Sequence, residues 1–187
     1  LALASTALMA QQYQVKGVAP EGAKKVYVSY LESSTTDSMA VTGKGKFVLN
    51  ADATKGLFAK VYTDNGKDAF VLLDGNVEVD FNVGAAKGTK ENDGLYAWEQ
   101  RLQPTEEEIK KLVTYFKELQ KNNTLTQEIQ SEIFAIYDSL QAITLAEYEK
   151  CYAENMQAKF PAIYFVQTMS HMPREKVLAL ADQKPEF

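Results

Sequence analysis

The spacing of apolar residues changes at residues 88–93, Gly-Thr-Lys-Glu-Asn-Asp. Before this segment apolar side chains alternate with polar ones, as in β-strands, and after it they recur every three or four residues, as in α-helices. The sequence therefore predicts an α+β chain, in which an N-terminal antiparallel β-sandwich of about seven strands precedes an all-helical segment of five to six helices. The predicted β-sandwich occupies residues 11–90, and the helical segment occupies residues 91–187.

Six runs rich in Val, Tyr and Phe predict strands, and residues 38–41 predict one more short strand. The six runs are residues 13–19, 25–31, 46–51, 56–63, 69–73 and 77–83. The segments Asp64-Asn65-Gly66 and Asp74-Gly75-Asn76 are typical of tight hairpin turns, because Gly and Asn readily adopt positive φ. They predict that the last three runs form an antiparallel meander.

Six helix starts are predicted, four from capping residues and two from prolines. Thr105 and Thr144 are each followed by a glutamate three residues later, which is the pattern of a capping box. Pro104 is expected to end the first helix, because proline has no backbone N–H to donate. The predicted starts are Asn92 or Asp93, Thr105, Thr124 or Thr126, Thr144, Pro161 and Pro173.

The composition excludes several classes of function. There are 20 Lys and Arg residues against 25 Asp and Glu residues, and the net charge of -5 disfavours nucleic acid and anionic lipid as partners. Cys151 is the only cysteine, so the chain holds no internal disulfide, no dithiol redox pair and no cysteine-rich zinc site. No cluster of residues predicts a catalytic, cofactor or metal site, and we expect none in this chain.

Cys151 and His171 are the two residues with the most reactive side-chain chemistry. A nucleophilic cysteine needs a helix N-terminus, a histidine or a cationic partner to lower the pKa of its thiol, whereas Cys151 falls in the middle of a predicted helix. Packing in the core or at its boundary is the favoured interpretation, and hydrolase or transferase chemistry through Cys151 is the least favoured alternative. His171, the only histidine, is expected at a solvent-facing or helix-terminal position.

Residues 1–10 resemble the end of a signal peptide, because they are apolar, small and uncharged and are followed by Gln11 and Gln12. Ten residues are too few for a membrane span, which needs about twenty. We interpret residues 1–10 as the remnant of a signal peptide and expect an exported protein that is soluble after cleavage and has no membrane span. The alternative is a buried N-terminal strand or helix.

Several short motifs follow one another in the order of a known family. They are Tyr13-Gln14-Val15-Lys16-Gly17, Gly45-Lys46-Phe47, and Gly88-Thr89 with Asn92-Asp93 and Leu95. From about Tyr13 to Leu102 the chain resembles the DUF4369-like N-terminal domain of unknown function of periplasmic thiol:disulfide oxidoreductases related to TlpA and ResA. The helices resemble the connector that precedes the thioredoxin fold in that family.

The resemblance implies a non-catalytic accessory region that positions or binds a partner and is truncated before a thioredoxin-like domain. The Trp-Cys-x-x-Cys dithiol of such a domain exchanges disulfides, but this chain has no Cys-x-x-Cys, so no catalytic residue is carried over. The implied partners are the following thioredoxin-like domain of the same polypeptide and a protein or peptide, with Tyr62 and Trp98 as candidate contacts. The alternative is a free-standing periplasmic protein whose aromatic residues bind a peptide or glycan.

Overall fold

The computed structural model describes residues 11–183, apart from the side chains of Gln167 and His171. The predicted signal-peptide remnant, residues 1–10, and the predicted position of the His171 side chain therefore lie outside what is described. The chain divides into two compact units, the first ending at Tyr96 and the second beginning at Ala97. None of the described helices is both long and apolar enough to cross a membrane.

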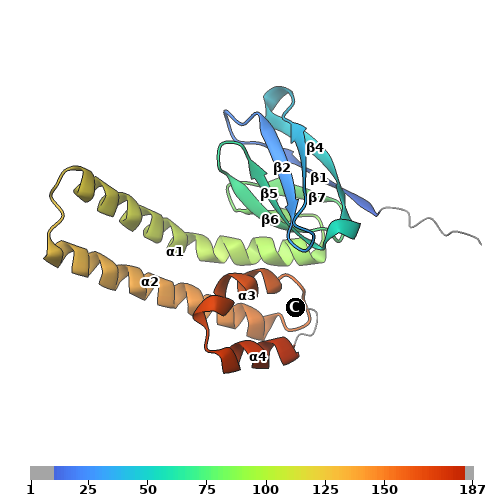
Figure 1. Cartoon of the computed structure of the whole chain (residues 1–187). Helices are drawn as coiled ribbons and strands as arrows, with labels where there is room; N and C mark the ends of the chain where they lie inside the picture. Colours follow the sequence, from blue (N-terminus) through green and yellow to red (C-terminus); the bar gives the residue numbers. More distant parts are fainter. Residues whose placement is uncertain (1–10, 184–187) are drawn as a thin grey trace, which may run out of the picture. The chain divides into compact units, whose positions relative to one another are not determined.

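The described part of the first unit contains eight strands in two four-stranded sheets (Figure 1). The strand orders are β4-β1-β7-β8 and β3-β2-β5-β6. The eight strands are β1 Gln12–Val18, β2 Lys25–Tyr30, β3 Thr36–Ala40, β4 Lys46–Asp52, β5 Phe58–Thr63, β6 Asp68–Leu72, β7 Val77–Asp80 and β8 Ala85–Lys87. The mixed α+β class is confirmed, with one strand, β8, beyond the number predicted.

The predicted antiparallel meander is wrong for its third strand. β5 and β6 pair antiparallel around the turn that ends at Gly66, as predicted, but β7 joins the other sheet and runs parallel to β1. The side chain of Asn76 holds the start of β7 there, because its Oδ1 accepts a hydrogen bond of 2.8 Å from the backbone N–H of Gln14. Gly17 permits the close pairing, since a Cβ at this position would lie 2.8 Å from the carbonyl oxygen of Val79.

The inward side chains of both sheets belong to one hydrophobic core. Alternation places Val26, Val28 and Tyr30 of β2 on the buried side, while Tyr27 and Ser29 lie on the outer side. The other sheet contributes its own buried positions to the same core, among them Val15, Phe47, Leu49, Val77 and Val79. The period-two pattern of the sequence therefore gives each sheet one face against the shared core.

The described helices number four rather than five to six (Figure 1). They are α1 Lys90–Lys121, α2 Gln127–Glu154, α3 Ala162–Thr168 and α4 Arg174–Gln183. α1 begins in the first unit and continues in the second. Two predicted helix boundaries are absent, because α1 runs through Pro104 and α2 runs through Thr144.

Neither residue interrupts its helix. Pro104 removes one backbone donor, a loss that a helix as long as α1 can tolerate. The hydroxyl of Thr144 donates to the carbonyl oxygen of Leu140 at 3.1 Å, inside the helix, instead of capping a new one. The predicted cap at Thr126 is confirmed, since its Oγ1 accepts from the N–H of Ile129 at 3.2 Å.

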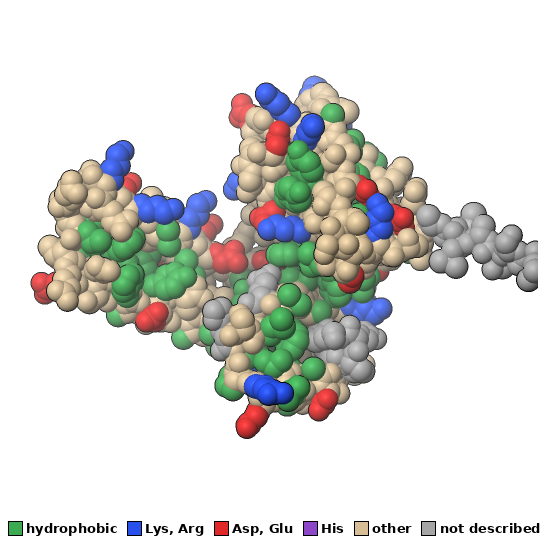
Figure 2. Space-filling model, viewed as in Figure 1, with side chains coloured by type: hydrophobic (Ala, Val, Ile, Leu, Met, Phe, Trp, Pro, Cys, Tyr) green, Lys and Arg blue, Asp and Glu red, His purple; other side chains and the backbone are tan. Residues whose placement is uncertain are grey.

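Residues 105–143 of the second unit, which we call the helical hairpin, comprise the distal arms of α1 and α2 and the turn between them. The rings of Phe116 and Phe134 join the two arms, with centroids 5.9 Å apart. Just outside the hairpin, within α1, the guanidinium of Arg101 pairs with the carboxylate of Glu147 on α2 at 2.9 Å. Figure 2 shows hydrophobic side chains gathered on the surface of this hairpin.

Candidate functional site

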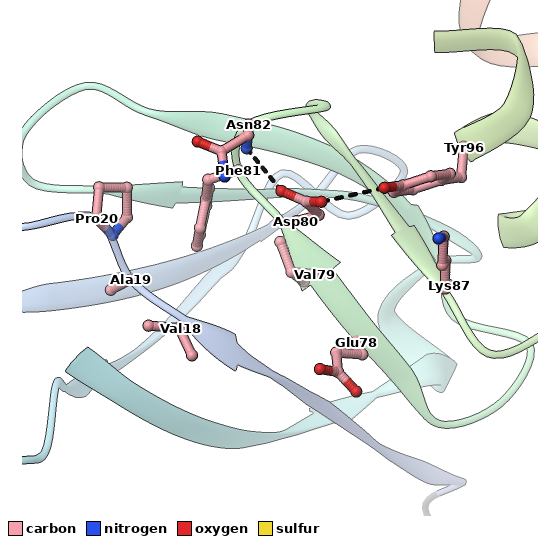
Figure 3. Close-up of a pocket in the computed structure, with 10 residues that line it drawn as sticks. All are labelled: Val18, Ala19, Pro20, Glu78, Val79, Asp80, Phe81, Asn82, Lys87 and Tyr96. Atoms are coloured by element: carbon pink, nitrogen blue, oxygen red, sulfur yellow. Dashed lines mark hydrogen bonds between the residues drawn. The ribbon is translucent and has the colours of Figure 1, made fainter. Parts of the chain in front are cut away.

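The candidate binding site is a cleft beside the ends of β1 and β7 in the first unit (Figure 3). It has a volume of about 600 Å³. Its lining residues come from β1 and the segment after it, from β7 and its turn, from β8 and from the start of α1. They are Val18, Ala19, Pro20, Glu78, Val79, Asp80, Phe81, Asn82, Lys87 and Tyr96.

The turn after β7 fixes the polar side of this cleft. The backbone carbonyl of Asp80 accepts hydrogen bonds from the N–H groups of Val83 at 3.2 Å and Gly84 at 2.9 Å, and Gly84 has φ of +81°. The carboxylate of Asp80 accepts from the N–H of Asn82 at 2.9 Å and from the hydroxyl of Tyr96 at 3.1 Å. A tight glycine turn therefore holds Asp80, and Asp80 in turn orients the Tyr96 ring.

The cleft combines an apolar wall with charged groups (Figure 3). Val18 lies on the apolar side and is 60% exposed. On the other side, Lys87 Nζ lies 3.9 Å from the centroid of the Tyr96 ring, in cation–π contact. Glu78 pairs with Lys16 at 3.6 Å. The cleft therefore presents apolar, cationic and anionic side chains to a ligand.

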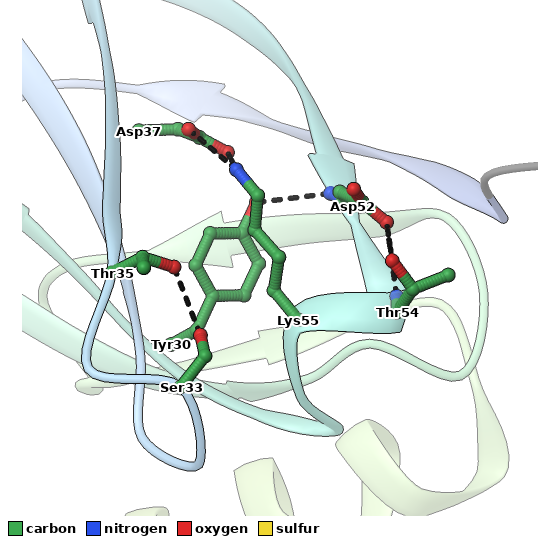
Figure 4. Close-up of polar contacts among 7 residues, drawn as sticks. All are labelled: Tyr30, Ser33, Thr35, Asp37, Asp52, Thr54 and Lys55. Atoms are coloured by element: carbon green, nitrogen blue, oxygen red, sulfur yellow. Dashed lines mark hydrogen bonds and ion pairs between the residues drawn. The ribbon is translucent and has the colours of Figure 1, made fainter.

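A polar cluster around Tyr30 forms a second group of close contacts in the first unit (Figure 4). The buried Tyr30 hydroxyl donates to Asp37 at 2.6 Å and accepts from the N–H of Asp52 at 2.9 Å. Lys55 Nζ lies 2.8 and 2.7 Å from the two carboxylate oxygens of Asp37. The hydrogen bonds from Lys55 and Tyr30 lower the pKa of Asp37, and burial raises the pKa of Tyr30. These bonds link β2 and β3 of one sheet to β4 of the other, which is a structural role.

The residues that carry the family resemblance near position 90 join β8 to α1. Thr89 Oγ1 accepts from the N–H of Asn92 at 3.2 Å, so Thr89 caps α1, and the predicted caps at Asn92 or Asp93 are wrong. Asn92 is fully buried and binds both backbone groups of Leu72, accepting from its N–H at 2.9 Å and donating to its carbonyl oxygen at 2.8 Å. The side chain of Asp93 accepts from the N–H of Gly88 at 3.0 Å. We call these contacts the Asn92 junction.

Tyr62 and Trp98, the two candidate partner contacts, belong to different units and differ in exposure. Tyr62 is half-buried on the outer face of β5. Trp98 is 7% exposed, Arg101 lies 4.5 Å from its ring, and its Nε1 has no hydrogen-bond partner among the described residues. Partner binding through these two residues stays a prediction, and only Tyr62 offers a ring face that a partner could reach.

Truncation of Tyr62 is expected to leave the first unit folded and to cost about 1 kcal/mol of stability. Its ring stacks on Tyr27 across the β2–β5 register, with centroids 4.9 Å apart and an interplanar angle of 11°. A double-mutant cycle of Tyr27→Ala and Tyr62→Ala, followed by urea denaturation, should give a coupling energy of about 0.5–1.5 kcal/mol. Strictly additive effects would show that the stack contributes nothing.

The second unit contains Cys151 and a buried acid that the sequence did not reveal. Cys151 is fully buried in α2, as the packing interpretation predicted. Glu99 of α1 is almost fully buried and accepts a hydrogen bond of 3.0 Å from the Tyr164 hydroxyl, and burial raises the pKa of the Glu99 carboxyl to about 7. Tyr164 stacks on Tyr148 at 4.7 Å. No group of three potential metal ligands occurs within the described part of the chain.

Comparison with known proteins found one family model that matches the first unit. Residues 13–95 match a family model described as Domain of unknown function (DUF4369). The match extends from β1 through the Asn92 junction, so the DUF4369 part of the resemblance is confirmed. Neither the curated proteins nor the solved structures contain a match to the chain. The description of this family assigns no activity.

Proposed function

We propose that this chain is a non-catalytic accessory region of an exported, periplasmic thioredoxin-like thiol:disulfide oxidoreductase. Its role is to position or bind a partner, and the first partner is a thioredoxin-like domain that follows in the same polypeptide. The observation that carries the proposal is that the only cysteine, Cys151, is fully buried inside α2. Because a disulfide exchange site needs an accessible thiolate and a second thiol, the proposal assigns the dithiol to the following domain.

Two further observations support an accessory role. The DUF4369 match covers the β-rich first unit, which resembles the domain that precedes the thioredoxin fold in this class of oxidoreductase. The cleft of Figure 3 presents side chains suited to recognition, with an apolar wall beside Lys87 and Asp80. Both fit a region that holds or orients another domain.

The decisive experiment is to read the coding frame beyond Phe187 in the native source and to compare the thiol activity of the present chain with that of the full reading frame. We expect a Trp-Cys-x-x-Cys motif within a thioredoxin-like pattern. Insulin reduction by dithiothreitol should then be accelerated by the longer protein, whereas the present chain and its Cys151→Ser variant should both match the uncatalysed rate. A stop codon at Phe187, or acceleration that depends on Cys151, would contradict the proposal.

A free-standing periplasmic binding protein for a peptide or glycan is the second candidate, and the cleft favours it. Val18→Glu should weaken ligand binding at least about tenfold, because it places a carboxylate on the apolar wall. Val48→Glu is the matched control, since Val48 is 52% exposed on the same sheet but does not line the cleft. Peptides and oligosaccharides would be titrated while the amide signals of Lys87 and Asn82 are followed by NMR. A chain that binds neither class of probe would exclude this candidate.

A further inference from the structure

The helical hairpin exposes more apolar surface than two helices can bury against each other. Among its described residues, Ile133 is the one large apolar side chain that is buried, while several others stand half exposed on both arms. The exposed ones are Val113, Tyr115, Phe134, Ile136 and Ile143. A pair of amphipathic helices with apolar residues beyond their mutual seam is typical of a bundle that contains further helices.

These exposed side chains divide between two opposite faces of the hairpin. Tyr115 and Ile136 line one groove, together with Leu112 and Leu140, so they share a face. Each residue of an α-helix is rotated by about 100° from the previous one, which places Val113 about 200° from Tyr115 and Phe134 about 200° from Ile136. Val113 and Phe134 therefore lie together on the opposite side, which we call the Val113/Phe134 face.

The charges of the two arms are opposite in sign. Residues 109–121 of α1 carry four lysines and one glutamate, whereas residues 127–143 of α2 carry three acidic residues and no Lys or Arg. On the Val113/Phe134 face, Lys117 lies one turn after Val113 on α1, and Asp138 lies one turn after Phe134 on α2. The face therefore has a basic half and an acidic half, each beside an exposed apolar side chain.

We propose that the Val113/Phe134 face binds the same face of a second copy of this chain, so that two hairpins form a four-helix bundle. A two-fold axis along the hairpins sets α1 of each copy antiparallel to α2 of the other, and the basic arm of one copy then meets the acidic arm of the other. A surface with one basic and one acidic half is self-complementary under this symmetry. The apolar side chains Val113 and Phe134 become buried at its centre.

The size of the face sets the expected affinity. At 1.5 Å per residue and about 10 Å per helix, the hairpin face measures about 25 by 20 Å, or about 500 Å² from each copy. A total of about 1,000 Å² is near the lower limit for a specific interface. We therefore expect a reversible dimer with a dissociation constant in the micromolar range.

Sedimentation equilibrium of the full chain tests the proposal, with variants on the two faces compared. Wild type should pass from monomer to dimer between about 1 and about 200 μM. Val113→Glu should weaken the dimer at least about tenfold, because symmetry buries the new carboxylate twice. Ile136→Glu is the matched control, as Ile136 is 50% exposed on the opposite face against 37% for Val113, and it should leave the dimer intact. Circular dichroism at 222 nm checks that both variants stay helical.

A charge exchange separates this specific pairing from general apolar association. Lys117→Glu and Asp138→Lys should each weaken the dimer several-fold, and the double variant should restore it, because the pair is only inverted. A wild-type chain that stays monomeric throughout this range would overturn the proposal. So would a dimer that Ile136→Glu disrupts and Val113→Glu does not, or a double variant without recovery.

Discussion

Replacing Asn92 with leucine is expected to lower the free energy of unfolding of the first unit by about 3 kcal/mol. The amide of Asn92 is the hydrogen-bond partner of both the N–H and the carbonyl oxygen of Leu72, at 2.9 and 2.8 Å, and all of these groups are buried. Leucine has nearly the same volume but neither donates nor accepts. Both backbone groups at the end of β6 would then be left in the interior without a partner.

The measurement is urea denaturation followed by far-UV circular dichroism, combined with hydrogen exchange of the Leu72 amide. Exchange at Leu72 should accelerate by about two orders of magnitude, as the loss of about 3 kcal/mol requires. Asn50→Leu is the matched control, because Asn50 is exposed on β4, and its effect should stay within about 0.5 kcal/mol. A loss below about 1 kcal/mol for Asn92→Leu would show that the junction does not hold α1 to β6.

The strands were predictable from the sequence to the extent that they depend on local pattern. Alternation gave Lys25–Tyr30 and Phe58–Thr63 nearly their observed bounds, because each has one face in the core. Ala85–Lys87 was missed because three residues between Gly84 and Gly88 carry no measurable period. The partner of β7 was also beyond local pattern, because Val77 pairs with Val15, far earlier in the chain.

The helix boundaries and the cleft were likewise predictable only where they depend on residues close together in the sequence. Local rules placed the cap at Thr126 correctly but broke α1 at Pro104, where continuation of the helix outweighs one lost hydrogen bond. The cleft had no sequence signal, because Val18, Asp80 and Tyr96 come from separate segments that only the fold brings together. Asn92 was recognised as a residue near a helix start, yet its bonds to β6 depend on tertiary structure.

The second unit is expected to lose stability as the pH rises from about 5 to about 8, with Glu99 as the main cause. Burial first, and the nearby charge of Glu106 second, raise the pKa of Glu99 from 4.5 to about 7, against the opposing hydrogen bond from Tyr164. The folded state therefore binds a proton more tightly than the unfolded state does. The resulting stability is complete below pH 4.5 and is lost as the pH rises through 7, by a total of about 3 kcal/mol.

The polar cluster around Tyr30 in the first unit should change stability with pH in the opposite direction. The pKa of Asp37 is lowered by its hydrogen bonds from Lys55 and Tyr30, so its contribution is present at neutral pH and is lost only under acid conditions. The two units should therefore respond differently to pH. Trp98 is the only tryptophan of the chain and belongs to the second unit, so its fluorescence reports on that unit separately.

Glu99→Gln should remove most of this pH dependence, because glutamine keeps an oxygen that can accept from the Tyr164 hydroxyl but carries no charge at any pH. At pH 8 the variant is expected to be more stable than wild type by up to about 3 kcal/mol, and at pH 5 the two should be nearly equal. Urea denaturation monitored by Trp98 fluorescence at both pH values measures this difference, with Glu118→Gln on the exposed side of the same helix as the control. A weaker dependence of the unfolding free energy on pH should remain in the variant, since burial also raises the pKa of Glu106. If stability depended on pH equally in wild type and in Glu99→Gln, the ionised Glu99 carboxylate would have no energetic cost in the folded state. Hydration of the carboxylate or a shift of α1 would explain that result.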